Sequence, residues 1–241
     1  MSIRRRRPLR SRLAHWAVFW LSTLIIVCAE SLLWGRAGQQ VTAQPSTPGR
    51  QIVVLLDTNP HQNKVLTVEL ALAEEIIQKL NQPGNAFSLI TFGSQPPVLV
   101  KSRVHAAAAI AALQNVTVEQ TKEKYFSVHL YDAVKLAFGQ FTGDADPKSL
   151  LVISEGNDYF PGKTFKQTVS RARQLHIAFD IAMIADHTLY GTKGIQRYGF
   201  DLRRLAGKTH GRYVEARGGP KKISGSLDRL SERILGLDRG Q

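Results

Sequence analysis

The chain has 241 residues, of which 43% are hydrophobic, 21% charged and 8% aromatic, and its formal net charge is +13. This composition is typical of a globular protein with one large or two small domains, and it excludes a disordered, collagen-like or multi-span membrane chain. Residues 1–43 carry seven arginines and one glutamate, so the remaining +7 is an ordinary solubility charge for about 200 residues.

The first 34 residues are arranged like an export signal. Six arginines within the first twelve residues precede a nearly uncharged run from Ala14 to Trp34. Small-x-Ala cleavage sites end at Ala29 and at Ala43, and without cleavage residues 14–34 are long enough to span a bilayer. Residues 1–34 therefore predict either a cleaved signal peptide or a retained anchor in the inner membrane. In both cases the rest of the chain is exported to the periplasmic or extracellular side.

The next segment, residues 35–50, consists mainly of Gly, Gln, Ser, Thr and Pro without periodicity, which predicts a flexible linker. Ile52–Leu56 is an uninterrupted apolar run, typical of a strand buried on both faces. Residues 66–80 then repeat apolar side chains every three or four positions, which predicts a helix packed on a sheet. Further predicted strands cover residues 86–92, 98–100, 150–153, 179–185 and 212–215, and further predicted helices cover 105–113, 130–141, 165–175, 202–205 and 223–235.

This alternation of strands and helices predicts an α/β fold. We expect a doubly wound, mostly parallel, Rossmann-like sheet with helices on both faces. The turn at residues 93–97 joins its two flanking strands as one antiparallel edge hairpin. In an open sheet of this kind ligands bind beyond the carboxyl ends of the strands, which directs attention to the loops Asp57–His61 and Ser154–Asp158.

The chain resembles the von Willebrand factor type A domain from residue 51 to residue 237. Val128–Ala133 is similar to the TALYDA segment of bacterial members, and Leu202–Ala206 with Gly211–Tyr213 is similar to their LRRLAxxTGGRY ending. The likeness is to exported bacterial members such as those of acidobacteria. It implies a domain over 51–237 that binds another protein and is not an enzyme.

The family's metal-ion-dependent adhesion site is only partly present. In the family a DxSxS motif, a threonine and a later aspartate hold a divalent ion. Asp57 matches the first aspartate, but Asn59 and His61 replace the serines, Val128 replaces the threonine and Glu155 replaces the later aspartate. Because Mg²⁺ requires six oxygen ligands at short distances, the resemblance implies a degenerate site and binding without a metal cofactor. If Mg²⁺ or Mn²⁺ binds at all, Asp57, Asn59 and Glu155 are its ligands.

The partner-binding face is expected at the same loops and comprises Asp57, Asn59, His61, Glu155 and Asp158. Each of these residues also has a simpler explanation. Asp57 can order its own turn, His61 can be an exposed loop residue, and Asp158 can be a turn residue. Asp132 lies just inside a predicted helix, where the helix dipole favours a carboxylate without any other role.

Three classes of function follow from these observations. The first is an exported, membrane-tethered adhesion or scaffold domain that binds another protein through the loops at the carboxyl edge of the sheet. The alternative is an α/β hydrolase-like enzyme with Asp57, His61 and Glu155 as acid and base groups, which requires these side chains to converge in a pocket. The third, binding of nucleic acid or an anionic surface, depends on basic residues that we interpret as a solvated face, because no aromatic stacking platform accompanies them. These residues are Arg203, Arg204, Lys208, Arg212, Arg217, Lys221 and Lys222. The expected partners are therefore a protein and, through the N-terminal segment, the membrane, but not nucleic acid.

Overall fold

Six strands of the described residues form one sheet in the order β3-β2-β1-β4-β5-β6. The strands are β1 (Gln51–Asp57), β2 (Ala86–Phe92), β3 (Val98–Val104), β4 (Lys148–Ser154), β5 (Ile177–Ile184) and β6 (Tyr213–Ala216). β1 pairs in parallel with β2 and β4, and β5 pairs in parallel with β4 and β6, whereas β3 runs antiparallel to β2. This computed structural model describes residues 49–59, 63–118, 128–143, 147–154, 162–184, 201–216 and 220–237.

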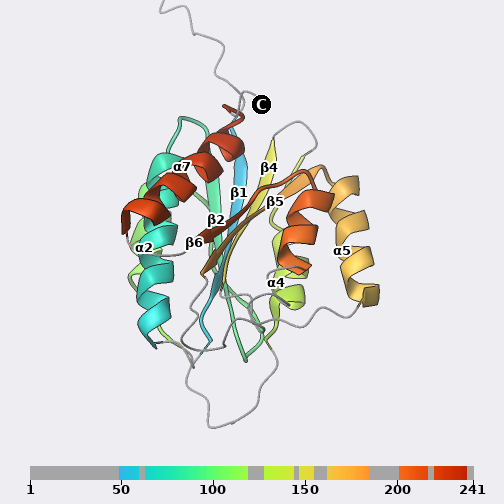
Figure 1. Cartoon of the computed structure of the whole chain (residues 1–241), viewed down its shortest axis with the longest axis horizontal. Helices are drawn as coiled ribbons and strands as arrows, with labels where there is room; N and C mark the ends of the chain where they lie inside the picture. The colour runs from blue at the N-terminus through green and yellow to red at the C-terminus, as the bar shows by residue number, and fades with distance from the viewer. Residues whose placement is uncertain are drawn as a thin grey trace, which may run out of the picture. The chain divides into compact units, whose positions relative to one another are not determined.

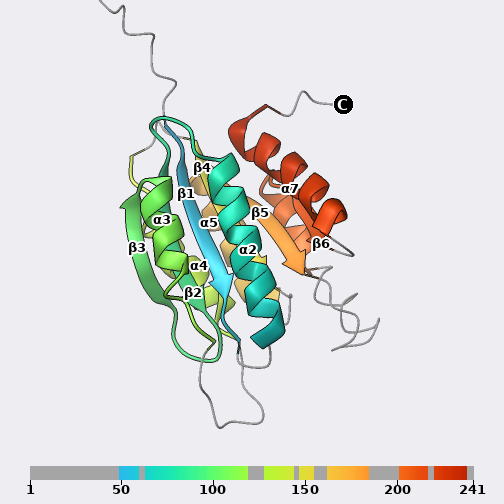
Figure 2. The same ribbon diagram turned by 90° about the vertical axis from the view of Figure 1, so that its left-hand side faces the viewer.

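Helices cover both faces of the sheet, which stands edge-on between them in Figure 1. One face is covered by α2 (Asn63–Lys79), α3 (Ala106–Leu113) and α7 (Pro220–Leu235), which lie in front of the strands in Figure 2. The other face is covered by α4 (Leu130–Phe138), α5 (Gly162–Gln174) and the helix over residues 201–208. The predicted α/β fold, doubly wound with one antiparallel edge hairpin, is confirmed.

The central strands are buried because helices pack on both of their faces. In β1, Ile52, Val54 and Leu56 contact the core on the α2 side, while Val53 and Leu55 contact the core on the α4 side. Successive side chains of a strand point to opposite faces, so a strand covered on both sides needs an unbroken apolar run. This is the physical reason that the sequence pattern identified β1 and β4.

Most element boundaries differ from the predicted ones by a few residues, and two of these differences have a clear physical cause. α4 ends at Phe138 instead of residue 141, because the backbone N–H groups of Gly139 and Gln140 bond to carbonyls three residues back, which tightens and ends the last turn. β3 extends to Val104, whereas the predicted strand ended at residue 100. The prediction ended early because residues 101–103 are polar and exposed on an edge strand, so the sequence shows no apolar pattern there.

The predicted signal or anchor at residues 1–34, with its proposed span at 14–34, lies outside the described residues, as does most of the linker. Within the described part of the chain, no helix combines the length and hydropathy needed to cross a bilayer.

Candidate functional site

The candidate site lies where β1 and β4 end beside each other. Because β1 connects onward to β2 on one side while β4 lies on its other side, this pair of strands is the switch point of the sheet, where open α/β folds bind ligands. Asp57 is the last residue of β1 and Ser154 the last of β4. The Ser154 hydroxyl donates a hydrogen bond of 2.9 Å to Asp57 Oδ2, so the two strand ends are joined by their side chains.

The second carboxylate oxygen of Asp57 orders the chain that follows it. Asp57 Oδ1 accepts a hydrogen bond of 3.0 Å from the backbone N–H of Asn59, which is the pattern of an Asx turn. Asp57 and Asn59 are each only 3% exposed. The turn-ordering role considered for Asp57 is therefore present, and it fixes where Asn59 lies relative to the strand end.

The same turn is also tied to the end of β2. The backbone N–H and the hydroxyl of Thr58 both donate to the carbonyl of Phe92, at 2.7 and 3.1 Å. One residue on, the carbonyl of Gly93 accepts from the backbone N–H of His129 at 2.9 Å, immediately before α4 begins. The ends of β1, β2 and β4 and the start of α4 thus meet at one edge of the sheet, the lower edge in Figure 2, where the arrowhead of β1 lies.

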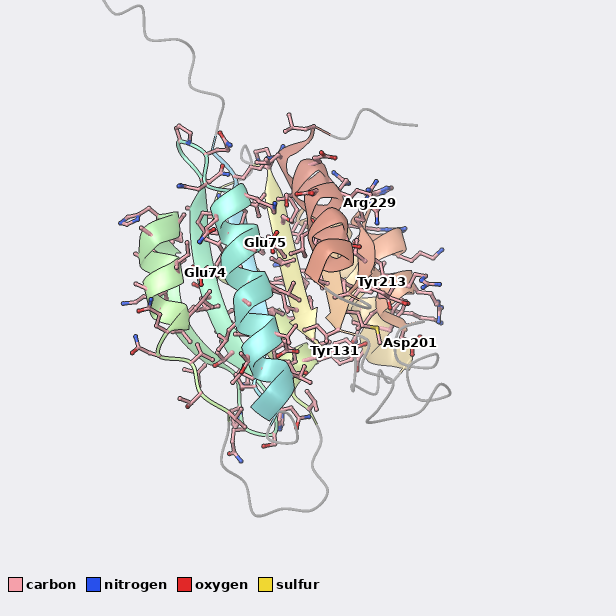
Figure 3. The ribbon with its side chains drawn as sticks, turned by 60° about the vertical axis from the view of Figure 1, so that its left-hand side comes forward. Glu74, Glu75, Tyr131, Asp201, Tyr213 and Arg229 are labelled. Carbon is pink, nitrogen blue, oxygen red and sulfur yellow. The ribbon has the colours of Figure 1, made fainter. Side chains whose placement is uncertain are left out.

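The residues before and within the first turn of α4 have structural roles. Val128 is partly buried and packs against the core on the α4 side. Asp132 accepts hydrogen bonds from Lys135 Nζ at 2.9 Å and from the His129 ring at 3.1 Å. The hydrogen bond from Lys135, and then that from His129, lower the pKa of Asp132. Asp132 therefore behaves as the carboxylate expected at a helix start, and Tyr131 beside it lies at the lower end of the sheet in Figure 3.

The described residues do not by themselves fit a divalent metal site. The side chain of Val128 has no donor atom, and both oxygens of Asp57 accept hydrogen bonds from the chain itself. Among the described residues, no group of three or more His, Cys, Asp or Glu side chains lies close enough to hold an ion. His61, Glu155 and Asp158 lie outside the described residues, so the structure brings together only Asp57 and Asn59 of the predicted face.

No role for Thr58 or Ser154 was predicted from the sequence. Both are almost fully buried, and both bind neighbouring strand ends. A usable signal was present, because two apolar parallel strands each ended in a polar residue. In register, Leu56 pairs with Ile153, which places Asp57 beside Ser154.

Comparison with known proteins identifies the fold. No known family model and no curated protein matches this sequence. Among solved structures, BatB from Bacteroides thetaiotaomicron is 13% identical with a TM-score of 0.59, covering 80% of this chain and all of the other. An aerotolerance-related membrane protein from Bacteroides fragilis is 16% identical with a TM-score of 0.56, covering 78% of this chain and 100% of that one. The von Willebrand factor domain of the type V pili tip protein Mfa5 from Porphyromonas gingivalis is 11% identical with a TM-score of 0.59, covering 81% of this chain and 98% of that one. The chain thus has the von Willebrand factor type A fold, as its sequence resemblance implied.

Proposed function

We propose that this chain is an exported adhesion or scaffold domain that binds another protein through the carboxyl edge of its sheet. The observation that supports this most is the convergence of three strand ends and the start of α4 around the buried Asp57–Ser154 pair. Such an edge is a well-packed base for the segments that follow it, and binding residues are commonly carried by loops on a rigid scaffold. The likeness to a pili tip protein and to a membrane protein agrees with a binding role outside the cytoplasm.

The proposed partner-binding face keeps the five residues expected from sequence, with Thr58 and Ser154 as supporting residues. Asp57 and Asn59 shape the loop from within, because both are almost fully buried. His61, Glu155 and Asp158 belong to the loops that follow β1 and β4. The proposal assigns no metal cofactor to this face, because Val128 offers no ligand and Asp57 is held by Ser154 and by the Asn59 N–H.

The same hydrogen bonds argue against the hydrolase-like alternative. A general acid or base must reach the substrate, directly or through one water. Asp57 is 3% exposed, and its two oxygens accept bonds from Ser154 and the Asn59 N–H. A carboxylate held in this way positions the chain, so we propose a non-enzymatic role for it.

The binding face can be tested with two matched positions at opposite ends of β2. Gln95 is exposed in the turn after β2, at the proposed edge, and Gln82 is exposed in the turn before β2, at the other end. A photo-cross-linking amino acid is placed at either position in the full chain and irradiated in intact cells of the source. We expect a defined adduct with another protein from position 95 and none from position 82. Identical adducts from both positions, or an adduct from position 82 alone, would place the partner elsewhere.

Export and tethering are proposed from the N-terminal sequence alone. The arginines before residues 14–34 resist translocation, so the domain that follows is expected outside the cytoplasm. Alkaline phosphatase fused after Gln241 should therefore be active, and the fusion should sediment with membranes if residues 14–34 are retained. An inactive fusion, together with an active cytoplasmic reporter at the same position, would contradict export.

A further inference from the structure

The outer edge of β3 is open along part of its length. β3 is the last strand of the sheet on one side, and none of the described strands pairs with it on its outer side. Figure 2 shows β3 at this edge of the sheet, beside α3. The strand begins with two exposed hydrophobic side chains, since Val98 is 58% exposed and Leu99 is 37% exposed. Neighbouring apolar side chains on an unpaired edge strand favour pairing with another chain.

The two halves of β3 differ in how well this edge is protected. Lys101, Ser102 and Arg103 are polar and exposed, and Arg103 has a positive φ of 47°. The register with β2 shifts twice within this half, between Val104 and Leu99. Charged side chains and bulges are the devices that prevent an edge strand from pairing further. Residues 98–100 contain no charged side chain, so the open part of the edge is limited to them.

The direction of the backbone groups in this open part follows from β2. The Phe92 carbonyl accepts a hydrogen bond from the Thr58 N–H, so the backbone groups of Phe92 face the chain of β1. Backbone groups alternate sides along a strand, and those of Ile90 therefore also face β1. Leu99 lies directly opposite Ile90 in the antiparallel pair. The N–H and the C=O of Leu99 consequently point away from β2, whereas those of Val98 point toward it.

An outward N–H and C=O beside exposed apolar side chains is a pattern that fits an extended polypeptide segment. Such a segment adds to an open sheet edge as a further strand, with backbone hydrogen bonds to the edge and side chains packed on its neighbours. The added strand at β3 is short, because Pro97 has no N–H and the register shifts begin after Leu99.

The short length decides between two possible occupants. A second copy of the chain could pair its own Leu99 with this one, but a stable dimer buries about 800 Å² on each partner, far more than residues 98–100 expose. A segment of a protein that is already bound nearby needs no such area, because its attachment is then intramolecular. Gln95, at the proposed binding face, lies in the turn that leads into β3, so the two contact areas are continuous.

We propose that the protein bound at the carboxyl edge adds an extended, apolar segment as a further strand along residues 98–100. Its backbone pairs with the outward N–H and C=O of Leu99, and its side chains cover those of Val98 and Leu99. The inference rests on the proposed function, because it requires a partner at that edge. It gives the start of β3 a binding role, whereas the sequence predicted only a strand of the edge hairpin there.

The test uses the full chain with the photo-cross-linking amino acid at position 95, in intact cells of the source. Two variants are compared, Leu99→Pro and Leu99→Ala. Both remove the leucine side chain, but only proline removes the outward N–H, and proline is tolerated on an edge strand where the N–H faces solvent. We expect the adduct yield of Leu99→Pro to be about tenfold below that of Leu99→Ala, because one backbone hydrogen bond to the partner is lost.

The outcomes separate this inference from the proposed function. Equal adduct yields from Leu99→Pro and Leu99→Ala would overturn the added strand and leave the proposed function intact. No adduct from position 95 with Leu99 unchanged would contradict the proposed function, and the added strand with it. If Leu99→Pro does not fold, Leu99→Lys and Leu99→Met replace the pair, because the two side chains are similar in length and only lysine brings a charge to the edge. We then expect an adduct yield about fivefold lower for lysine, and equal yields would refute the added strand.

Discussion

The buried carboxylate of Asp180 provides a sharp test of how β4, β5 and the start of β6 are held together. Asp180 lies in β5, almost without solvent exposure, and it accepts hydrogen bonds from the Ser149 hydroxyl and from the backbone N–H of Arg212. Replacement by alanine removes both acceptors. Replacement by asparagine keeps an oxygen for the Arg212 N–H and supplies an amide that can donate to the Ser149 oxygen.

The two substitutions differ in the groups that they leave unsatisfied. A buried donor without an acceptor costs about 1–3 kcal/mol. Asp180→Ala leaves the Ser149 hydroxyl and the Arg212 N–H in that state, so we expect it to lower the free energy of unfolding by about 2–5 kcal/mol. Asp180→Asn keeps both contacts and removes a desolvated charge, so its free energy of unfolding at pH 7.5 should lie within about 1 kcal/mol of the wild type.

The pH dependence follows from the pKa of Asp180, which burial raises above its ordinary value. A carboxyl group with a raised folded-state pKa binds its proton more tightly in the folded chain than in the unfolded chain. Its stabilising contribution is therefore complete below the unfolded-state pKa and is lost as pH rises through the folded-state pKa. Relative to Asp180→Asn, the wild type should gain stability as pH falls from 7.5 toward 4.

Urea unfolding of the full chain in mild detergent, followed by tyrosine fluorescence and far-ultraviolet circular dichroism at both pH values, measures these differences, because all three tryptophans lie within residues 1–34. If the wild type instead loses stability relative to Asp180→Asn on acidification, the hydrogen bonds from Ser149 and the Arg212 N–H, together with the attraction of Arg233 and Arg212, outweigh the effect of burial on the pKa of Asp180. If Asp180→Ala is as stable as Asp180→Asn, the two hydrogen bonds contribute nothing. Either result would refute the reasoning.

Three further predictions concern the backbone, the candidate site and metal binding. Gly211→Ala should destabilise the fold by about 3 kcal/mol, because its Cβ would lie 1.9 Å from the Phe179 carbonyl oxygen. The control Gly207→Ala should gain about 0.5–1 kcal/mol in urea unfolding, because alanine is the better helix former there. Ser154→Ala should lower the free energy of unfolding by about 1.5–3 kcal/mol, because the hydrogen bond to the Asp57 carboxylate is lost. The control Ser102→Ala, at an exposed position, should change the unfolding midpoint little. Equal effects of the two substitutions would show that the Asp57–Ser154 hydrogen bond does not stabilise the fold. Millimolar Mg²⁺ or Mn²⁺ should not raise the melting temperature above its value in EDTA, but should raise it after Val128→Thr, His61→Ser and Asn59→Ser are combined. A rise in the natural chain that Asp57→Ala abolishes would reveal a working metal site.

The fold could be predicted from the sequence because its central strands and helices are strongly periodic. Ile52–Leu56 and Leu150–Ile153 are unbroken apolar runs because helices cover both of their faces. The end of β3 was missed for the opposite reason. Its residues are exposed on an edge strand, where burial leaves no alternation in the sequence, and pairing with β2 holds them in the sheet.

The candidate site was predictable only in part. Asp57 and Asn59 were found because one aspartate of a known motif follows an apolar strand. The roles of Thr58 and Ser154 depend on which strands are neighbours, and strand order is a property of the tertiary fold.

Two buried side-chain hydrogen bonds join β4 to its neighbours at different levels of the sheet, and β4 measures their separation. Ser149, near the start of β4, bonds to Asp180, and Ser154, at the end of β4, bonds to Asp57. At about 3.3 Å per residue these two serines are about 16 Å apart, beyond the distance of about 7–10 Å within which substitutions usually couple. Ser149 and Ser154 also bond to different strands, because Asp180 belongs to β5 and Asp57 to β1. Asp180→Asn should therefore leave the cross-link from position 95 intact, and loss of that cross-link would show that the two hydrogen bonds are coupled through β4.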